Sequence, residues 1–178
     1  GLITKRYLQE LLGEEIHKSE VQNAPVSLFI FDLDHFKKLN DTYGHLTGDR
    51  VLKDTAEIVR KTIRVGDISA RWGGEEFLLV LPGTPKEGAW RAAEKVREAL
   101  ARHAFQDDDG KPIGKVTLSG GVAAFPGDGR TQSELVGAAD EALYHAKRSG
   151  RNQVLMAQPK YFSDAGDEPL LPSASGAA

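Results

Sequence analysis

Two pairs of carboxylates stand at the ends of apolar runs, and they are the residues best placed to do chemistry. Asp32-Leu33-Asp34 directly follows the apolar run Val26 to Phe31, and Glu75-Glu76 lies between Gly73-Gly74 and a second apolar run. The chain has no cysteine and few histidines, so carboxylates are its main candidate metal ligands, and they favour a hard cation, magnesium above all. Magnesium usually takes its other ligands from phosphates and water, so the pattern indicates a site for a nucleoside triphosphate.

A plainer interpretation is open for each pair. Asp32 and Asp34 could cap the helix that follows, and Glu75-Glu76 could be the solvated tip of a hairpin. Two acidic pairs beside apolar strands argue against both, because a carboxylate near a core costs free energy unless it is paired or bound to metal.

The apolar periodicity predicts the elements that must position these residues. We expect helices near 5–17, 36–39, 49–63, 87–101 and 133–149, the last ended by Gly150, and strands near 26–31, 68–72, 77–81, 116–124 and 153–156. A polar turn is expected over 41–48, a hairpin turn at Gly73-Gly74, and the tip of a second, small hairpin at 107–110. The alternation predicts an α/β (α+β) sandwich, with a mixed central sheet of about five strands and helices packed on it.

Composition limits the functional classes. The 178 residues fit one domain, which we place at 1–157, and the Pro-, Gly-, Ser- and Ala-rich residues 158–178 are expected to be a disordered tail. A net charge of −3 argues against a nucleic-acid partner, and the absence of cysteine suits a cytoplasmic location. The sequence has no apolar run of roughly 18 residues, so we expect no direct membrane insertion.

Four sequence blocks occur in order, and together they are more specific than any one alone. Along the chain they are Phe31 to Asp49, Arg71 to Phe77, Val116 to Val122, and Ala139 to Lys147 followed by Gly150-Arg151-Asn152. In this order and spacing they resemble the GGDEF family of diguanylate cyclases, in its GGEEF form, from Gly1 to about Met156. The resemblance implies a palm-like nucleotidyl cyclase fold and an enzyme that joins two GTP molecules into cyclic di-GMP, releasing two pyrophosphates.

The resemblance also implies a metal site. Asp32 and the backbone carbonyl of Leu33 would bind magnesium, or manganese in its place. Glu75 is our choice for the metal-linked catalytic residue that helps the 3′-hydroxyl lose its proton, and Glu76 is the second candidate ligand. Neighbouring strand residues point to opposite faces, so the division of roles between the two glutamates stays open.

The implied substrate contacts fall into two groups. Asn40 and Asp49 would read guanine and His45 would line the same pocket, although His45 could simply be a turn residue between Gly44 and Gly48. Gly73 and Gly74 would leave room for a nucleotide beside the backbone.

The phosphates would be held at a helix start and a helix end. Backbone amides around Phe36 and Lys37 would bind them at the start of a helix. Lys147 and Arg151 would contact them as cations, although without the resemblance both are ordinary charges at a helix C-terminus.

Regulation is implied by Arg64-Val65-Gly66-Asp67, which matches the family's RxxD site for product inhibition. Arg64 would bind phosphate or the guanine Hoogsteen edge and Asp67 the guanine N–H groups, and the alternative is an exposed turn with a weak local ion pair. One domain holds one GTP, so catalysis implies a face-to-face homodimer. Gly1 to Leu8 resembles the motif that opens the family's domain with its start removed, which implies a fragment of a longer protein, membrane-bound or free, with an upstream sensory domain.

Three other functions remain open. The chain could be a catalytically silent module that senses GTP or cyclic di-GMP, although none of its catalytic positions departs from the family pattern. It could be another nucleotidyl cyclase or polymerase-like transferase, which an ATP preference would reveal. A purely structural dimerisation domain predicts that Glu75→Gln changes nothing.

Overall fold

A five-stranded sheet forms the centre of the computed structural model, which describes residues 5–158. The strands are β1 (Val26–Leu33), β2 (Ile68–Arg71), β3 (Glu76–Pro82), β4 (Leu118–Phe125) and β5 (Val154–Met156). Their order is β2-β3-β1-β4-β5, with β4 and β5 parallel and every other neighbouring pair antiparallel. The predicted mixed sheet of about five strands is confirmed.

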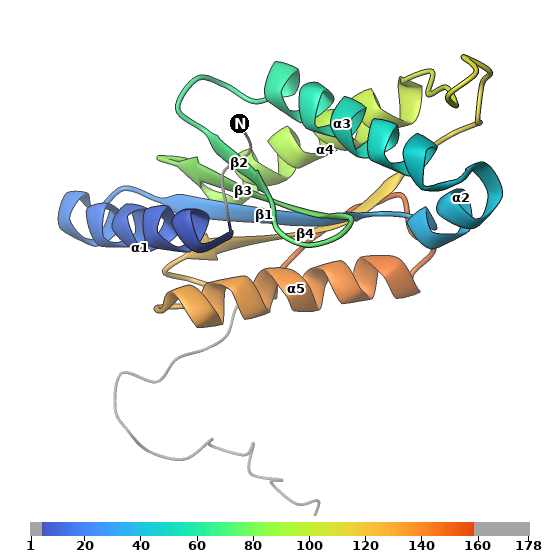
Figure 1. The fold of residues 1–178 in the computed structure, drawn as a ribbon. Helices are drawn as coiled ribbons and strands as arrows, with labels where there is room; N and C mark the ends of the chain where they lie inside the picture. The colour runs from blue at the N-terminus through green and yellow to red at the C-terminus, as the bar shows by residue number, and fades with distance from the viewer. Residues whose placement is uncertain (1–4, 159–178) are drawn as a thin grey trace, which may run out of the picture.

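Helices cover both faces of the sheet, and Figure 1 shows α3 and α4 on one side and α1 and α5 on the other. The helices are α1 (Lys5–Gln22), α2 (Phe36–Tyr43), α3 (His45–Thr62), α4 (Lys86–Arg102) and α5 (Gln132–Arg148). Each face of the sheet has its own apolar cluster. Two separate cores are expected when a central sheet is buried on both sides.

The alternation of side chains along β1 decides which way its acidic end points. Phe29, Phe31 and Leu33 belong to the cluster beneath α3 and α4, whereas Leu28 and Ile30 belong to the cluster beneath α1 and α5. Because successive strand residues face opposite sides, Asp32 must face the α5 side. The apolar run therefore places one carboxylate between the sheet and α5.

A glycine allows α5 to lie close to the sheet at β4. A Cβ atom at Gly121 would come within 2.0 Å of the carbonyl oxygen of Ala139 and 2.5 Å of the backbone nitrogen of Leu143. No side chain fits in that space, so Gly121 permits direct backbone contact between β4 and α5. This close approach holds the end of α5 near the acidic end of β1.

The connection between α2 and α3 differs from the prediction. A polar turn was expected over residues 41–48, but α2 continues to Tyr43 and α3 begins at His45. Gly44 alone, with φ +86°, separates the two helices. The prediction was wrong because one glycine in a conformation that L residues disfavour is enough to reverse the chain.

The remaining boundaries agree with the prediction apart from small shifts. The second hairpin is closed by a single bridge between Gln106 and Pro112 around the turn at 107–110. The last helix ends at Arg148, so Arg151 lies beyond it in a turn. Between residues 5 and 158, no helix is long and apolar enough to cross a membrane. The predicted disordered tail lies, apart from Gln158, outside the described residues.

Candidate active site

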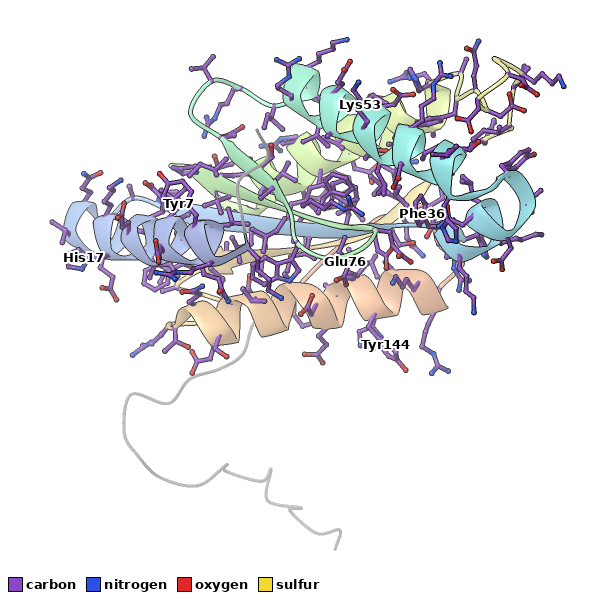
Figure 2. The ribbon with its side chains drawn as sticks, in the orientation of Figure 1. Tyr7, His17, Phe36, Lys53, Glu76 and Tyr144 are labelled. Atoms are coloured by element: carbon purple, nitrogen blue, oxygen red, sulfur yellow. The ribbon has the colours of Figure 1, made fainter. Side chains whose placement is uncertain are left out.

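The two acidic segments meet where β1 and β3 pair. Asp32 is the cross-strand partner of Glu76, at the last pair of this antiparallel ladder. Residues directly opposite each other project from the same face of a sheet, with their Cβ atoms about 5 Å apart. Figure 2 shows Glu76 at the hairpin end, between the sheet and α5. The fold therefore brings together carboxylates from the two segments singled out in the sequence.

Lys147 of α5 joins this pair. Its ammonium group donates a hydrogen bond to Oδ2 of Asp32, across 115 residues of sequence. The other carboxylate oxygen of Asp32, Oδ1, is buried and has no hydrogen-bond partner within the part of the chain that the structure describes. Within residues 5–158, Asp32 thus has one carboxylate oxygen without a partner, while its other oxygen is bonded to the Lys147 ammonium group.

Burial raises the pKa of the Asp32 carboxyl group above its ordinary value. The hydrogen bond and charge of Lys147 oppose this change, and the charges of Glu76 and Asp34 add to it. The pKa of Glu75 is also raised, first by burial and then by the charge of Asp32, against Lys147 and Arg71. When desolvation and mutual repulsion raise the pKa of carboxyl groups, their ionised form is unfavourable, and a bound cation stabilises it.

Arg71 holds the turn that carries the glutamates. Its Nε donates to the carbonyl oxygens of Gly73, at 3.2 Å, and of Gly74, at 2.8 Å. A Cβ atom at Gly73 would lie 2.6 Å from a carboxylate oxygen of Glu76, so the space beside Gly73 is filled by that side chain. Gly74 has no atom within 4 Å of its Cβ position, and only there does the turn leave open room. Room for a nucleotide beside the two glycines stays a prediction.

The three residues expected at guanine lie on two consecutive helices. Asn40 is on α2, and His45 and Asp49 are on the first turns of α3. Oδ1 of Asn40 is buried without a hydrogen-bond partner among residues 5–158, and a Cβ atom at Gly48 would lie 1.8 Å from it. Gly48 thus makes room for Asn40, while His45 and Asp49 are exposed.

A cavity of about 880 Å³ opens between α3 and β2. Asp49 of α3 and Arg71 of β2 line it, and Phe77 and Leu52 contribute apolar walls. Asp32 is not among its lining residues, so this cavity is distinct from the carboxylate cluster. Its position leaves the carboxylate of Asp49 accessible to a ligand.

The residues expected at the phosphates come from two ends of helices. Phe36 and Lys37 open α2, and Figure 2 shows Phe36 at that start. His35 precedes them in a left-handed conformation, with φ +57°, which turns the chain from β1 into α2. Lys147 bonds Asp32, and the exposed Arg151 lies in the turn after α5. The structure therefore joins Lys147 to the carboxylates, not to the other expected phosphate contacts.

Within the RxxD segment, Arg64 and Asp67 form an ion pair with each other. Nε of Arg64 lies 3.0 Å from Oδ1 of Asp67, and the backbone N–H of Arg64 donates to Oδ2 at 3.1 Å. The Arg64 guanidinium also donates to the carbonyl oxygen of Pro82, at 2.6 Å. Asp67 is thereby enclosed, while more than half of the Arg64 side chain is exposed.

These residues fit a magnesium ion that is completed by substrate. Within residues 5–158 there is no cluster of three histidine or acidic side chains that could hold a metal alone. Asp32 nevertheless presents an unpartnered buried oxygen, and Glu76 faces it across the strands. One or two carboxylates with phosphate oxygens are the usual magnesium ligands, so the donor set suits a metal that arrives with a nucleotide.

Two features of the site went unnoticed in the sequence. Arg71 was recognised only as part of a motif, yet it holds the hairpin turn. For Asp34 the sequence suggests only a helix cap, yet its carboxylate accepts hydrogen bonds from Thr117, Ser119 and the backbone of Asn152. Only the Arg-Gly-Gly spacing could have signalled the first role, because the partners of Asp34 are far away in sequence.

Comparison with known protein families gives a match over almost the whole described domain. Residues 1–153 match the family described as diguanylate cyclase, GGDEF domain. Response regulator PleD of Caulobacter vibrioides is 39% identical over 155 residues, which cover 87% of this chain and 34% of PleD. Diguanylate cyclase A of Treponema denticola is 38% identical over 157 residues, covering 86% of this chain and 42% of that protein. The chain thus spans about a third to two fifths of these relatives.

Solved structures of GGEEF and GGDEF domains also superpose on this chain. The active GGEEF domain of a diguanylate cyclase from Vibrio cholerae superposes with a TM-score of 0.82 at 31% identity, covering 90% of this chain and 100% of that one. The GGDEF domain of DgcB from Caulobacter crescentus, in complex with c-di-GMP, has a TM-score of 0.81 at 30% identity, covering 87% and 91%.

Proposed function

Because this chain belongs to the family of diguanylate cyclase GGDEF domains, we propose that it condenses two GTP molecules into cyclic di-GMP and two pyrophosphates. One observation carries the proposal: Asp32, with an unpartnered buried oxygen, faces Glu76 and bonds Lys147 at the C-terminal end of β1. This arrangement concentrates negative charge, which a divalent cation would neutralise while it also binds phosphate oxygens.

The proposed reaction is a nucleotidyl transfer performed twice. The 3′-hydroxyl oxygen of one GTP attacks the α-phosphorus of the other, a 3′-O–P bond forms, and the bond to the β-phosphate breaks. Glu75, whose pKa is raised by burial and by Asp32, is suited to accept the hydroxyl proton. Pyrophosphate leaves with the electron pair of the broken bond. A second, symmetric attack closes the ring.

The metal site comprises Asp32, the Leu33 carbonyl, Glu75 and Glu76, which would hold magnesium or manganese. When bound, the metal neutralises phosphate charge and lowers the barrier to deprotonation of the hydroxyl. In the absence of metal, the Lys147 ammonium group pairs with the Asp32 carboxylate, and this pairing reduces the repulsion among the carboxylates.

Substrate recognition is divided between the two helices after β1. The Asp49 carboxylate would accept hydrogen bonds from the guanine N1 and N2 hydrogens, and Asn40 would bond the O6 and N3 edge. His45 would line the same pocket. The amides of Phe36 and Lys37 would hold the phosphates at the helix start, together with Lys147 and Arg151.

Product inhibition would operate at the Arg64–Asp67 turn. The two side chains pair with each other, so a bound cyclic di-GMP must replace their mutual contact with contacts to phosphate and guanine. The Asp67 side chain is enclosed, so the contacts with the product must offset the loss of its bonds to Arg64. Arg64→Ala should therefore abolish inhibition by added cyclic di-GMP while leaving the initial rate within about twofold.

The working unit would be a homodimer, because each domain supplies one GTP site and the reaction needs two. A sensory domain upstream in a longer, cytoplasmically exposed protein would control this dimerisation. The relatives, of which this chain covers only part, are consistent with such an arrangement.

The decisive experiment follows product by chromatography after incubation with GTP and magnesium. We expect cyclic di-GMP from the wild type at high protein concentration or with an added dimerisation module, and its loss in Glu75→Gln. The control is Glu98→Gln, an exposed glutamate of α4 whose carboxylate bonds Arg102 within the same helix. Binding of GTP without turnover under all these conditions would favour the alternative of a silent sensor, and a preference for ATP would refute the guanine assignment.

A further inference from the structure

Asp34 lies two residues from Asp32, but its carboxylate is fully engaged by the protein. Oδ1 accepts a hydrogen bond from the hydroxyl of Ser119 at 2.6 Å. Oδ2 accepts from the hydroxyl of Thr117 at 2.7 Å and from the backbone N–H of Asn152 at 3.0 Å. Asp34 is buried, and using it as a metal ligand would strand these donors. Its role must therefore lie in what it holds.

What it holds is an unusual turn after α5. Gly150, Arg151 and Asn152 have φ values of +109°, +63° and +44°, so three consecutive residues are left-handed. Such conformations cost free energy in residues with a Cβ atom and persist only where the surroundings enforce them. The bond from the Asn152 N–H to Asp34 is one such constraint, and it spans 118 residues of sequence.

Two further contacts support the same turn from other directions. The backbone N–H of Arg151 donates to the carbonyl oxygen of Ala146 at 3.1 Å, and Arg97 of α4 donates to the side-chain oxygen of Asn152 at 3.1 Å. The Arg151 guanidinium has no hydrogen bond or ion pair with any residue from 5 to 158. The backbone is therefore fixed while the cationic side chain remains available.

We propose that Asp34 is the positioning residue for Arg151: by holding the Asn152 N–H it sets the left-handed turn that directs the Arg151 guanidinium toward the terminal phosphates of the nucleotide. This inference rests on the proposed function, in which Arg151 binds those phosphates. Asp34 sits between the metal-binding strand and the phosphate-binding turn, so it sets the distance between these two parts of the site.

The consequence differs from that of a merely structural aspartate. If Asp34 acts through Arg151, removing its side chain weakens binding of a triphosphate and spares binding of a monophosphate, which lacks the phosphates that Arg151 contacts. If Asp34 only stabilises the fold, both nucleotides lose affinity together. Asn at this position can keep its carbonyl oxygen on Asn152 and Thr117 while its amide donates to Ser119, whose hydroxyl can rotate to accept.

The test compares the affinities of 3′-deoxy-GTP and 3′-deoxy-GMP at saturating magnesium, because neither has the 3′-hydroxyl needed for reaction. Asp34→Ala should reduce the triphosphate-to-monophosphate affinity ratio by roughly tenfold to a hundredfold, as expected for a lost charge-assisted contact. Arg151→Ala should reduce the ratio similarly, and the double variant should be no worse than Arg151→Ala alone. Asp34→Asn should stay within about threefold of the wild type.

The matched control is Asp128→Ala. Asp128 is also a buried aspartate, bonded to Lys86 and to the backbone N–H of Ala124 at the opposite end of β4. Its loss should lower the melting temperature without changing the affinity ratio. An unchanged ratio in Asp34→Ala, or additive losses in the double variant, would overturn the inference.

The outcomes separate this inference from the proposed function. A wild type that prefers the triphosphate and makes cyclic di-GMP, with an unchanged ratio in Asp34→Ala, defeats the inference alone. A wild type that prefers the triphosphate but makes no product defeats the proposed function, and the ratio still decides the role of Asp34. A wild type that has no triphosphate preference and makes no product defeats both, and one that makes product without that preference defeats the inference alone.

Discussion

Replacing Asp32 with asparagine should make the metal-free protein more stable while removing its activity. The Asp32 side chain is buried, and its Oδ1 has no partner within residues 5–158. An unsatisfied buried oxygen of a charged group costs about 1–3 kcal/mol. The compensating ion pair involves Lys147, whose side chain is 36% exposed, so solvent screening limits its value to about 1 kcal/mol. Asparagine keeps a carbonyl oxygen for Lys147 and removes the buried negative charge, whose desolvation is the larger cost.

The expected magnitude is a gain of about 1 kcal/mol in the free energy of unfolding at pH 7. For a chain of this size that corresponds to a rise in melting temperature of roughly 2–4 °C. Cyclic di-GMP synthesis should fall by at least about a hundredfold, since even residues behind a metal ligand cost 10–100-fold when changed. Circular dichroism with EDTA measures the first quantity, and chromatography with magnesium measures the second.

The pH dependence of folding stability gives a second, independent test of the cost of burying Asp32. Burial raises the pKa of Asp32 in the folded protein above its unfolded value of 3.8, so the folded state binds the proton more tightly. Stability should therefore fall as pH rises through the window between 3.8 and the raised pKa, and Asp32→Asn should flatten this slope. A melting temperature lower than that of the wild type in EDTA at pH 7, with an unchanged pH slope, would refute the reasoning.

Asp128→Asn is the matched control for this experiment. Both oxygens of Asp128 have partners, Lys86 Nζ at 2.7 Å and the backbone N–H of Ala124 at 2.7 Å. Removing its charge weakens satisfied bonds and should destabilise the protein by about 2 kcal/mol. The two buried aspartates should therefore respond with opposite signs.

Substitutions at two glycines and at Arg64 give the remaining predictions. Gly48→Ala places a Cβ atom 1.8 Å from Oδ1 of Asn40, so the amide must move and GTP affinity should fall about tenfold in a titration. An unchanged affinity for both GTP and ATP would exclude Asn40 as a base reader. Gly121→Ala forces β4 away from α5, because its Cβ would lie 2.0 Å from the Ala139 carbonyl oxygen; chemical denaturation should show a loss of about 1–3 kcal/mol, and a loss below about 0.5 kcal/mol would contradict the close packing. Arg64→Ala should lose product inhibition, measured as the initial rate against added cyclic di-GMP; retained inhibition would place the inhibitory site elsewhere.

Local pattern was sufficient for most elements of the fold. The apolar run before Asp32 predicted a buried strand, and Gly73-Gly74 between two short apolar segments predicted the hairpin of β2 and β3. These predictions succeed because the pleat and the turn are determined by neighbours in sequence. The turn expected over residues 41–48 was wrong because Gly44 alone reverses the chain, and α2 and α3 continue up to it on either side and pack against each other.

The site divides in the same way. The types of its residues and their motif order were apparent from the chain, including Asp32, Glu75 and Glu76. Local geometry also accounts for the Arg64–Asp67 pair, which closes within a single turn. Which side chains would meet was a separate matter, because a motif specifies residue types and leaves their partners open.

The sequence by itself therefore determined an α/β sandwich with an acidic site of the diguanylate cyclase family. Only the tertiary structure decided that Lys147 bonds Asp32, across 115 residues, and that Asp34 holds Asn152, across 118. The physical reason is that β1 lies in the middle of the sheet, and α5 packs closely on that sheet at Gly121 of the neighbouring β4. Pairing between segments so far apart depends on this packing and leaves no trace in local spacing.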